Sequence, residues 1–362
     1  MRVLIAGGGT GGHLYPGIAV ARELTARVPG AEVTFVGTAA GIESRVVPQE
    51  GFALDLIRSG GLKGKSLSDL AHGLSLLPLS AIDAARVIST RRPSLVIGVG
   101  GYSSGPVVLL AAVQRIPTML LEQNAVPGLT NRLLAFVVDA AAVTYEESVR
   151  FFSGKAFVAG NPVRPEFVRG TEEAHDDRAS PPRAVRILVC GGSQGAHAIN
   201  VAMVEAAARL AAATPGVAVT HQTGERDLDM VRDGYRRAGL EARVEPFLFA
   251  MAGEMNAADV VVSRAGATTL AEIATTGRPA ILVPLPGATD DHQRKNAHAL
   301  VSQGAALMVE QRELTGDRLA AEILGLAADT NRRGRMREAL RSFARPDAAR
   351  VIVDRALELV AR

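Results

Sequence analysis

The 362-residue sequence contains no tryptophan and only one cysteine, Cys190. A single cysteine excludes a disulfide within the chain and agrees with a reducing compartment. The start of the chain also lacks a long apolar run, because Met1-Arg2 leads only into the short run Val3–Ala6 before glycines follow. That run is too short for the core of a signal peptide or for a membrane span. We therefore expect a cytoplasmic protein.

An excess of charge of one sign is missing as well. The formal net charge is +3, from 40 basic and 37 acidic residues that are mostly interleaved, which argues against a nucleic-acid binder. Hydrophobic residues make up 48% of the chain, as in folded globular proteins. The length fits two domains of roughly 100–200 residues each.

One stretch departs from this balance of charge. Between Arg58 and Arg92, six basic residues outnumber two acidic ones around the apolar run Leu74–Leu79. Basic residues beside an apolar helix are attracted to an anionic bilayer surface. The alternative is an ordinary helix that buries its apolar side in the core, and the composition of the stretch alone favours that simpler interpretation.

Short apolar runs alternate with longer helical patterns along the chain. These runs are rich in Val and Ile, as buried parallel strands are, and the alternation predicts an α/β fold with crossover helices. The expected strands are Val3–Ala6, Val33–Val36, Leu95–Val99, Thr118–Leu121, Ile187–Cys190, Val217–His221, Val260–Ser263 and Ala280–Pro284.

The two halves of the chain open alike, with a strand, a glycine turn and a helix at Val3–Gly12 and again at Ile187–Gly195. This repeat of a whole domain predicts two Rossmann-like domains. Two prolines interrupt the pattern in Gly160–Pro165, where the boundary is expected. We predict an N-terminal domain over residues 1–160, a second domain over 161–345 and a C-terminal helix over 346–362 that packs back on the first domain.

The first glycine loop, Gly7-x-Gly9-x-x-Gly12, satisfies the dinucleotide fingerprint, so an NAD-dependent oxidoreductase is one hypothesis. The next strand, however, ends in Gly37-Thr38 and not in the acidic residue that binds a ribose diol. No arginine for an NADP phosphate follows until Arg45. The amide groups of this loop and of Gly191–Gly195 suit a phosphate, or the glycines simply permit tight turns.

Several polar residues follow the expected strands. His13 is a candidate general base, or only a helix cap. The hydroxyls of Thr268 and Thr269 suit phosphate oxygens, and Glu272 offers two acceptor oxygens to a diol. The run Asp290–Gln293 resembles a metal site, but neighbours in sequence seldom point at one ion. We expect neither a metal nor a cofactor.

Seven motifs occur in the order and spacing of the MurG family, and together they cover nearly the whole chain. They are GGGTGGH at Gly7–His13, GGYSSGP at Gly100–Pro106, EQNAVPGLTN at Glu122–Asn131, GNPVR at Gly160–Arg164, GGSQGA at Gly191–Ala196, SRAGATTLAE at Ser263–Glu272 and DDHQRKNA at Asp290–Ala297. The chain therefore resembles the MurG family.

The resemblance implies a GT-B architecture, in which two Rossmann-like domains with parallel sheets face each other across a cleft. It implies transfer of N-acetylglucosamine from UDP-N-acetylglucosamine to lipid I, giving lipid II with inversion at the anomeric carbon and without a metal. The expected partners are therefore UDP-N-acetylglucosamine, the undecaprenyl-linked acceptor, an anionic membrane surface and other cell-wall synthesis proteins, but no nucleic acid. The expected location is the cytoplasmic face of the membrane, as a peripheral protein.

The resemblance also implies contacts to the donor. Leu248 would read uracil through its backbone, although the family often has Ile there; Glu272 would bind the ribose, and Gln293 the sugar hydroxyls. The full set of donor contacts is Thr10, Gly11, Gly12, Asn124, Arg164, Ser193, Leu248, Ala267, Thr268, Thr269, Leu270, Ala271, Glu272 and Gln293.

Inversion needs one direct attack and therefore a base, for which His13 and Glu122 are the candidates in the first domain, with His13 preferred. The acceptor diphosphate is expected at the helix start Gly101, Tyr102, Ser103 and Ser104. A lipid substrate also favours membrane contact for Leu74–Leu79 over the simpler interpretation.

Two alternatives stay open at this level. A UDP-N-acetylglucosamine 2-epimerase shares the architecture and the nucleotide but needs no lipid. A catalytically inactive UDP-sugar-binding protein would keep the nucleotide site without turnover.

Overall fold

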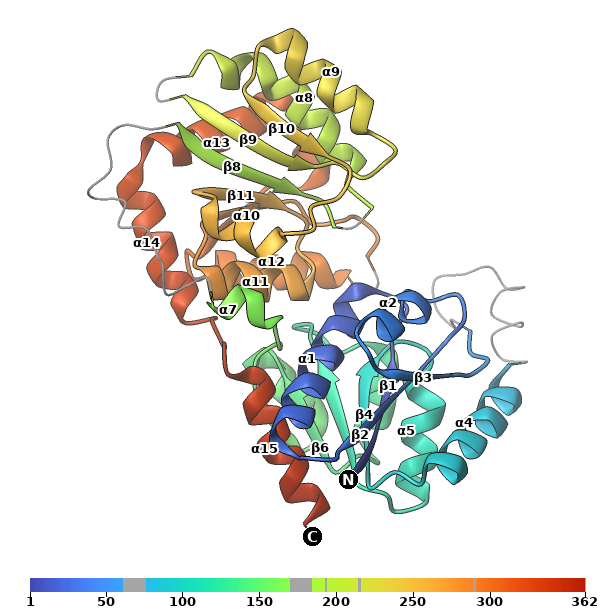
Figure 1. Cartoon of the computed structure of the whole chain (residues 1–362). Helices are drawn as coiled ribbons and strands as arrows, with labels where there is room; N and C mark the ends of the chain where they lie inside the picture. Colours follow the sequence, from blue (N-terminus) through green and yellow to red (C-terminus); the bar gives the residue numbers. More distant parts are fainter. Residues whose placement is uncertain (61–75, 170–183, 193, 214–215, 289–290, 362) are drawn as a thin grey trace. The chain divides into compact units, whose positions relative to one another are not determined.

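The computed structural model describes residues 1–60, 76–169, 184–192, 194–213, 216–288 and 291–361 (Figure 1). The chain forms two compact units, Met1–Arg164 with Arg345–Arg362, and Pro165–Ala344. The division after Arg164 falls inside the segment Gly160–Pro165, a few residues beyond the expected boundary. Each unit is described by itself.

The first unit contains a seven-stranded parallel sheet of order β3-β2-β1-β4-β5-β6-β7. Its strands are β1 (Arg2–Gly7), β2 (Glu32–Gly37), β3 (Ala53–Leu56), β4 (Leu95–Gly100), β5 (Thr118–Glu122), β6 (Ala140–Val143) and β7 (Ala156–Val158). Its helices are α1 (Gly11–Arg27), α2 (Glu43–Gln49), α4 (Leu77–Arg91), α5 (Ser104–Val113), α6 (Leu129–Leu134), the 3-10 helix η1 (Glu146–Phe152) and α15 (Ala348–Val360).

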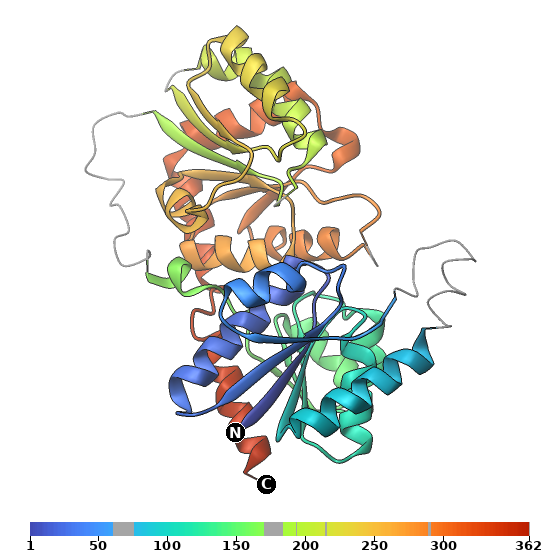
Figure 2. The same ribbon diagram turned by 45° about the vertical axis from the view of Figure 1, so that its right-hand side comes forward.

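Alternate residues of these strands pack into two separate hydrophobic cores, one on each side of the sheet. Ile5 of β1 packs on the side of the sheet covered by α1 and α15, and Leu4 packs on the side covered by α4, α5 and α6. Both sides are buried, which explains why the strands read as continuous apolar runs. The last helix, α15, lies against α1 in both views (Figure 2), with an ion pair of 2.7 Å between Arg27 and Asp354.

The second unit contains a six-stranded parallel sheet of order β10-β9-β8-β11-β12-β13. Its strands are β8 (Val185–Cys190), β9 (Val217–Gln222), β10 (Ala242–Glu245), β11 (Val260–Ser263), β12 (Ala280–Leu282) and β13 (Ala306–Met308). Its helices are α7 (Pro165–Arg169), α8 (His197–Ala211), α9 (Leu228–Ala238), α10 (Met251–Ala257), α11 (Ala267–Thr276), α12 (His292–Val301), the 3-10 helix η3 (Gln311–Glu313), α13 (Gly316–Ala328) and α14 (Thr330–Arg341).

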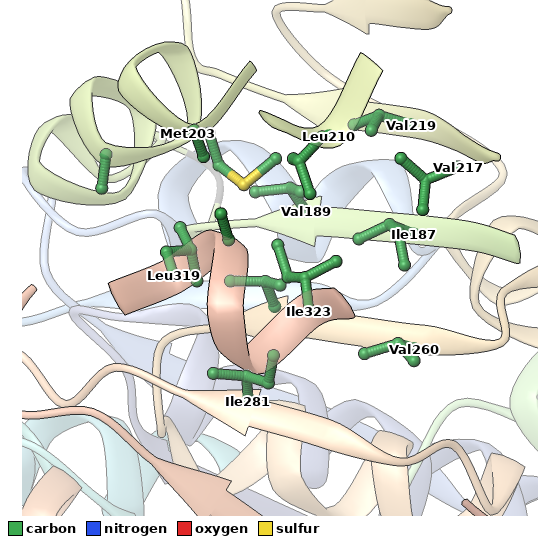
Figure 3. Packing of buried hydrophobic residues seen from close by; sticks show 14 of the residues in the cluster. Ile187, Val189, Met203, Leu210, Val217, Val219, Val260, Ile281, Leu319 and Ile323 are labelled. Carbon is green, nitrogen blue, oxygen red and sulfur yellow. The ribbon is translucent and has the colours of Figure 1, made fainter. Parts of the chain in front are cut away.

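One core of this unit lies between the sheet and helices α8 and α13 (Figure 3). Met203 of α8 and Ile323 of α13 point at the strand residues Ile187 and Val189. Burying each such side chain contributes about 1.5–3 kcal/mol relative to leaving it exposed. The core thereby fixes the sheet whose loops carry the polar motifs.

The eight expected strands are all present, and the predicted α/β class with parallel sheets is confirmed. Sequence analysis missed the short strands β3, β6, β7, β10 and β13, which have three or four residues each. Strand β6 is mostly alanine, a residue depleted in strands, so only its place beside β5 makes it extended.

The strand order reverses between β1 and β4 in the first unit and between β8 and β11 in the second. Ligands of open α/β sheets bind outside the carboxyl ends of the strands at such a reversal. In the first unit these ends carry Gly7–His13 and Gly100–Ser104, and in the second they carry Gly191–Gly195 and Arg264–Glu272. The fold therefore brings motifs that are distant in sequence together in pairs.

Candidate functional site

His13 lies in the first turn of α1, directly after the first glycine loop. Its Nδ1 lies 3.3 Å from Oγ1 of Thr10. The edge of its ring lies against Gly100, because a Cβ atom built on Gly100 would be 2.9 Å from Cδ2 and 3.1 Å from Nε2 of His13. Gly100 also has a φ of 95°, which side chains rarely adopt. Thr10 and Gly100 together define where the imidazole sits.

The two loops of the first unit pack backbone against backbone. The amide of Gly8 donates to the carbonyl of Gly100 over 3.3 Å, and a Cβ on Gly101 would lie 2.6 Å from the carbonyl oxygen of Gly8. No larger residue fits at Gly101. Thr10, Gly11 and Gly12 of the expected donor set therefore belong to the same edge of the sheet as the expected acceptor loop.

Within that acceptor loop, the two serine hydroxyls are turned inward. Ser103 and Ser104 are buried, and Oγ of Ser104 lies so close to Gly98 that a Cβ there would be 2.6 Å away. Tyr102 is about half exposed, and its carbonyl accepts from the Ser59 hydroxyl over 3.0 Å. A phosphate at this loop would therefore be held by amide N–H groups at the start of α5, not by hydroxyls.

Glu122, the second candidate base, is only 3% exposed, and burial raises its pKa. Its Oε1 accepts from the amide and the side chain of Asn124, at 3.0 and 3.2 Å, and its Oε2 accepts from Gly128 N–H and Asn131 Nδ2, at 3.2 and 2.8 Å. A carboxylate has about four acceptor sites, and four donors occupy them. In the structure Glu122 therefore anchors this loop, and His13 stays the preferred candidate for the general base.

Two other expected donor contacts lie in the same unit. The side chain of Asn124 is held by Glu122, as described above. The guanidinium of Arg164 lies over the ring of Tyr15, 5.2 Å from its centroid, and Tyr15 follows His13 by two residues on α1. The last residue of the GNPVR motif, Arg164, thus contacts the first turns of α1.

In the second unit, α11 begins at Ala267 with Gly266 as its N-cap. The side chains of Ala267 and Leu270 are buried, so these residues offer a ligand only their backbone, whereas Thr268 and Thr269 are partly exposed. Amide groups at a helix start attract phosphate. The residues Ala267–Glu272 together form the first turns of α11.

Glu272 is only 7% exposed, next to the end of β8. Burial, and after it the charge of Glu272, raise the pKa of Cys190 to about 12. Cys190 is the register partner of Ser263 at the carboxyl ends of β8 and β11. Glu272 therefore lies near the reversal of strand order, on the helix from which it is predicted to bind the ribose.

Gln222, at the end of β9, is a functional candidate that sequence analysis missed. Its side chain is buried, with Nε2 donating to the carbonyl of Gly192 and Oε1 accepting from the amide of Leu248, both over 2.8 Å. Because the amide of Leu248 is bound to Gln222, only the carbonyl of Leu248 is left for the expected backbone contact with uracil. The sequence could have indicated Gln222, because it is a polar residue at the end of a strand, as the residues of the other motifs are.

The remaining donor contacts are less well defined. Oε1 of Gln293 accepts from the amide of Leu285 over 3.0 Å, which ties α12 to the loop after β12. Ser193 lies outside the described residues. Arg264, from the SRAGATTLAE motif, donates to the carbonyls of Val283 and Pro284 and so fixes that loop from the other side.

A metal-like cluster was considered at Asp290–Gln293, of which Asp290 lies outside the described residues. Within the described ranges, no three His, Cys, Asp or Glu side chains are gathered in a way that would hold a metal ion.

A chain of polar side chains lies behind the second glycine loop, exposed at His197 and buried from Asp227 inward. Asp227 is 2.9 Å from Nδ1 of His197, the first residue of α8, and accepts from Asn200 Nδ2 over 2.8 Å. Oδ1 of Asn200 lies 3.0 Å from Nε2 of His221, and Nδ1 of His221 lies 2.7 Å from the hydroxyl of Tyr235. Burial lowers the pKa of His221 to about 3, so its ring is neutral at pH 7. Since Asn200 donates to Asp227, His221 must donate through Nε2 and accept from Tyr235.

Comparison with known proteins gives two matching family models. The glycosyltransferase family 28 N-terminal domain matches residues 3–143, and the family 28 C-terminal domain matches residues 186–352. A protein of Anaeromyxobacter sp. (strain Fw109-5), named UDP-N-acetylglucosamine–N-acetylmuramyl-(pentapeptide) pyrophosphoryl-undecaprenol N-acetylglucosamine transferase, is 49% identical over 363 residues. That match covers 100% of this chain and 94% of the relative.

Solved structures agree with this result. The crystal structure of Acinetobacter baumannii MurG matches with a TM-score of 0.80 and 29% identity, over 99% of each chain. This match confirms the expected GT-B fold. A UDP-GlcNAc 2-epimerase from Neisseria meningitidis, solved with UDP-GlcNAc bound, matches with a TM-score of 0.70 over 99% of this chain and 100% of that one. At 15% identity, the epimerase shares the fold alone.

Proposed function

Since the chain belongs to the MurG family of family 28 glycosyltransferases, we propose that its reaction is carried out by the loops at the two reversals of strand order. The enzyme transfers N-acetylglucosamine from UDP-N-acetylglucosamine to the 4-hydroxyl of the N-acetylmuramyl residue of lipid I, with inversion, and forms lipid II for peptidoglycan. The observation that carries the assignment of the donor site is the position of Glu272 beside the second reversal.

The second unit is proposed to bind the donor. Amide groups at the start of α11 and the Thr268 and Thr269 hydroxyls would bind the diphosphate, and Glu272 would accept from the two ribose hydroxyls. The positive end of a helix stabilises the charge that develops on UDP as it leaves. Leu248, Gln293 and Ser193 complete the proposed set in this unit.

His13 is the proposed general base. In this proposal its Nδ1–H donates to Thr10, which leaves Nε2 as the basic nitrogen. The acceptor's 4-hydroxyl oxygen bonds to the anomeric carbon as the bond from that carbon to UDP breaks, and the hydroxyl proton passes to Nε2. General base catalysis of this kind typically contributes about 10²–10⁴-fold.

The first unit is proposed to meet the bilayer through α4, α5 and α6, which pack side by side on one side of the sheet. Of the expected run Leu74–Leu79, Leu74 lies outside the described residues and Leu77 is about half exposed. Large apolar side chains are also exposed at the ends of the neighbouring helices: Val113, the last residue of α5, is 70% exposed, and Phe136, in the turn after α6, is 76% exposed. No helix among the described residues is long and apolar enough to cross a membrane.

Basic residues accompany this apolar surface. Arg86 on α4 and Arg115 after α5 are exposed, and the ammonium group of Lys155 donates to the carbonyl of Phe136 over 2.9 Å. Apolar side chains with a basic surround suit a surface of anionic lipids. They support a peripheral location at the cytoplasmic face of the membrane, where a lipid-linked acceptor is found.

The direct test is transfer of labelled N-acetylglucosamine from UDP to a lipid I analogue, with EDTA present. Labelled lipid is the expected product. Conversion of the donor alone to UDP-N-acetylmannosamine, or to N-acetylmannosamine and UDP, without lipid product would instead indicate an epimerase. Donor binding without any turnover would indicate an inactive binding protein.

A further inference from the structure

The first glycine loop already holds a carboxylate that belongs to the chain itself. Glu43, the first residue of α2, is 1% exposed. The amide of Gly9 donates to its Oε2 over 2.7 Å. The amide and the hydroxyl of Thr38 donate to its Oε1, over 2.9 and 3.0 Å. One side chain thus links the loop after β1 to the loop after β2.

Three glycines make room for this carboxylate. A Cβ atom would lie 2.5 Å from Oε2 of Glu43 if built on Gly8, 2.1 Å from the same oxygen if built on Gly41, and 2.3 Å from Cγ if built on Gly37. Any side chain at these positions would displace the carboxylate, since carbon and oxygen atoms do not approach so closely. These three glycines therefore leave space for the Glu43 side chain in addition to forming turns.

The arrangement changes the interpretation of the loop. Amide groups after a strand, at the start of a helix, are the usual cradle for a phosphate, and sequence analysis left that option open. At Gly9, however, the N–H is already occupied by a charged acceptor. A phosphate at the same place would lose this donor and would also be repelled by the buried negative charge.

We infer that Glu43 is a positioning residue whose carboxylate takes the anion position of the first glycine loop, so that the loop aims Thr10 and His13 and binds no substrate phosphate there. The inference rests on the proposed role of His13 as the base. The connection is short: Glu43 holds Gly9, the next residue Thr10 is the N-cap of α1, and Thr10 contacts His13. A shift of about 1 Å in such a group costs on the order of a hundredfold in rate.

The first measurement follows His13 itself. Its ring signal is recorded by NMR in histidine-labelled protein and assigned by its absence from His13→Ala. We expect Glu43→Ala to shift or broaden this signal, because nothing then holds Gly9. We also expect inorganic phosphate to move the His13 signal further in Glu43→Ala than in the wild type, because the freed Gly9 N–H can then donate to it, whereas phosphate at the start of α5 would act alike in both proteins.

Two comparisons control the experiment. Glu50→Gln changes a carboxylate at the other end of α2, where Glu50 pairs with Arg22, and it should leave the His13 signal unchanged. Glu43→Gln preserves the side-chain volume and offers one acceptor oxygen to donors from two loops, so its signal should lie between those of Glu43→Ala and the wild type. If Glu43→Ala does not fold, the same measurements are made on Glu43→Gln.

The second measurement is kinetic. Turnover should fall on the order of tenfold to a hundredfold in Glu43→Ala, and KM for UDP-N-acetylglucosamine should change by a smaller factor than turnover. An unmoved His13 signal in both Glu43 variants, or a response of His13 to phosphate that is as large in the wild type as in Glu43→Ala, would overturn the inference. The NMR measurement needs no turnover, so an inactive wild type would defeat the proposed function without deciding this result.

Discussion

The hydroxyl of Tyr235 lies 2.7 Å from Nδ1 of His221, in the interior of the second unit. Asn200 lies against the other ring nitrogen, and burial keeps the imidazole neutral. The pKa of His221 is lowered to about 3 from an ordinary value of 6.5, mainly by burial. The unfolded chain therefore binds a proton between these pH values and the folded chain does not, so stability is lost as the pH falls from 6.5 toward 3.

From this shift we predict an acid-sensitive second unit. Each pH unit below 6.5 should remove about 1.4 kcal/mol from the free energy of unfolding until the folded pKa is reached. Urea unfolding followed by circular dichroism between pH 7 and 4.5 measures this slope. His221→Gln should be less stable at pH 7 but show a flatter slope, and parallel slopes in the two proteins would assign the acid sensitivity to other groups.

Glu272→Ala should weaken donor binding. Hydrogen bonds from ribose hydroxyls to a charged group contribute about 1.5–3 kcal/mol, so affinity for UDP should fall roughly tenfold to a hundredfold by calorimetry. Affinity for 2′,3′-dideoxy-UDP should be the same in variant and wild type, because that ligand offers Glu272 no hydroxyls. Glu313→Ala, an exposed change on η3, is the matched control; equal UDP affinity in Glu272→Ala and wild type would exclude the ribose contact.

His13→Ala should lower turnover by about 10²–10⁴-fold while leaving the dissociation constant of UDP unchanged. The reason is that His13 is proposed to take a proton only as the acceptor attacks. Single-turnover transfer and calorimetry on the same sample separate the two effects. His298→Ala, at an exposed site on α12, should behave as wild type. A loss of UDP affinity equal to the loss of turnover would point to donor binding as the role of His13.

Gln222→Met should raise KM for the donor more than KM for the acceptor. The methionine side chain keeps most of the volume but cannot donate to Gly192 or replace the acceptor for Leu248. The loops that contain Gly192 and Leu248 therefore lose the side chain that links them. About tenfold is expected, since about 1.4 kcal/mol corresponds to that factor and one such bond contributes 0.5–1.5 kcal/mol. Steady-state kinetics with each substrate varied decides this, and an unchanged donor KM would remove Gln222 from the site.

Val113→Ser combined with Phe136→Ser should reduce co-sedimentation with anionic vesicles, and added salt should reduce the binding of the wild type. Burying a large apolar side chain in the bilayer contributes about 1.5–3 kcal/mol, and the electrostatic attraction is screened by salt. Phe249→Ser, which removes an exposed aromatic ring of the second unit, is the control. Transfer to a water-soluble acceptor should be unaffected, and equal sedimentation of the double variant and wild type would place the membrane contact elsewhere.

The sequence by itself determined the two parallel-sheet units and the places of the glycine loops. Both depend on local signals: an apolar run such as Val3–Ala6 is buried on two sides, and glycines follow where the backbone turns sharply. The end of each run then places His13 and Glu272 at the carboxyl edge of a sheet, since parallel strands all end on the same side.

Only the tertiary structure decided which polar groups are available to a ligand. Glu122 has the side chain of a general base, but four donors from the following loop and the first turn of α6 occupy its carboxylate. Glu43 and Gln222 have no motif to mark them, and their partners Gly9 and Gly192 lie 34 and 30 residues away. A hydrogen bond between distant segments depends on how the chain packs, which no local pattern of residues records.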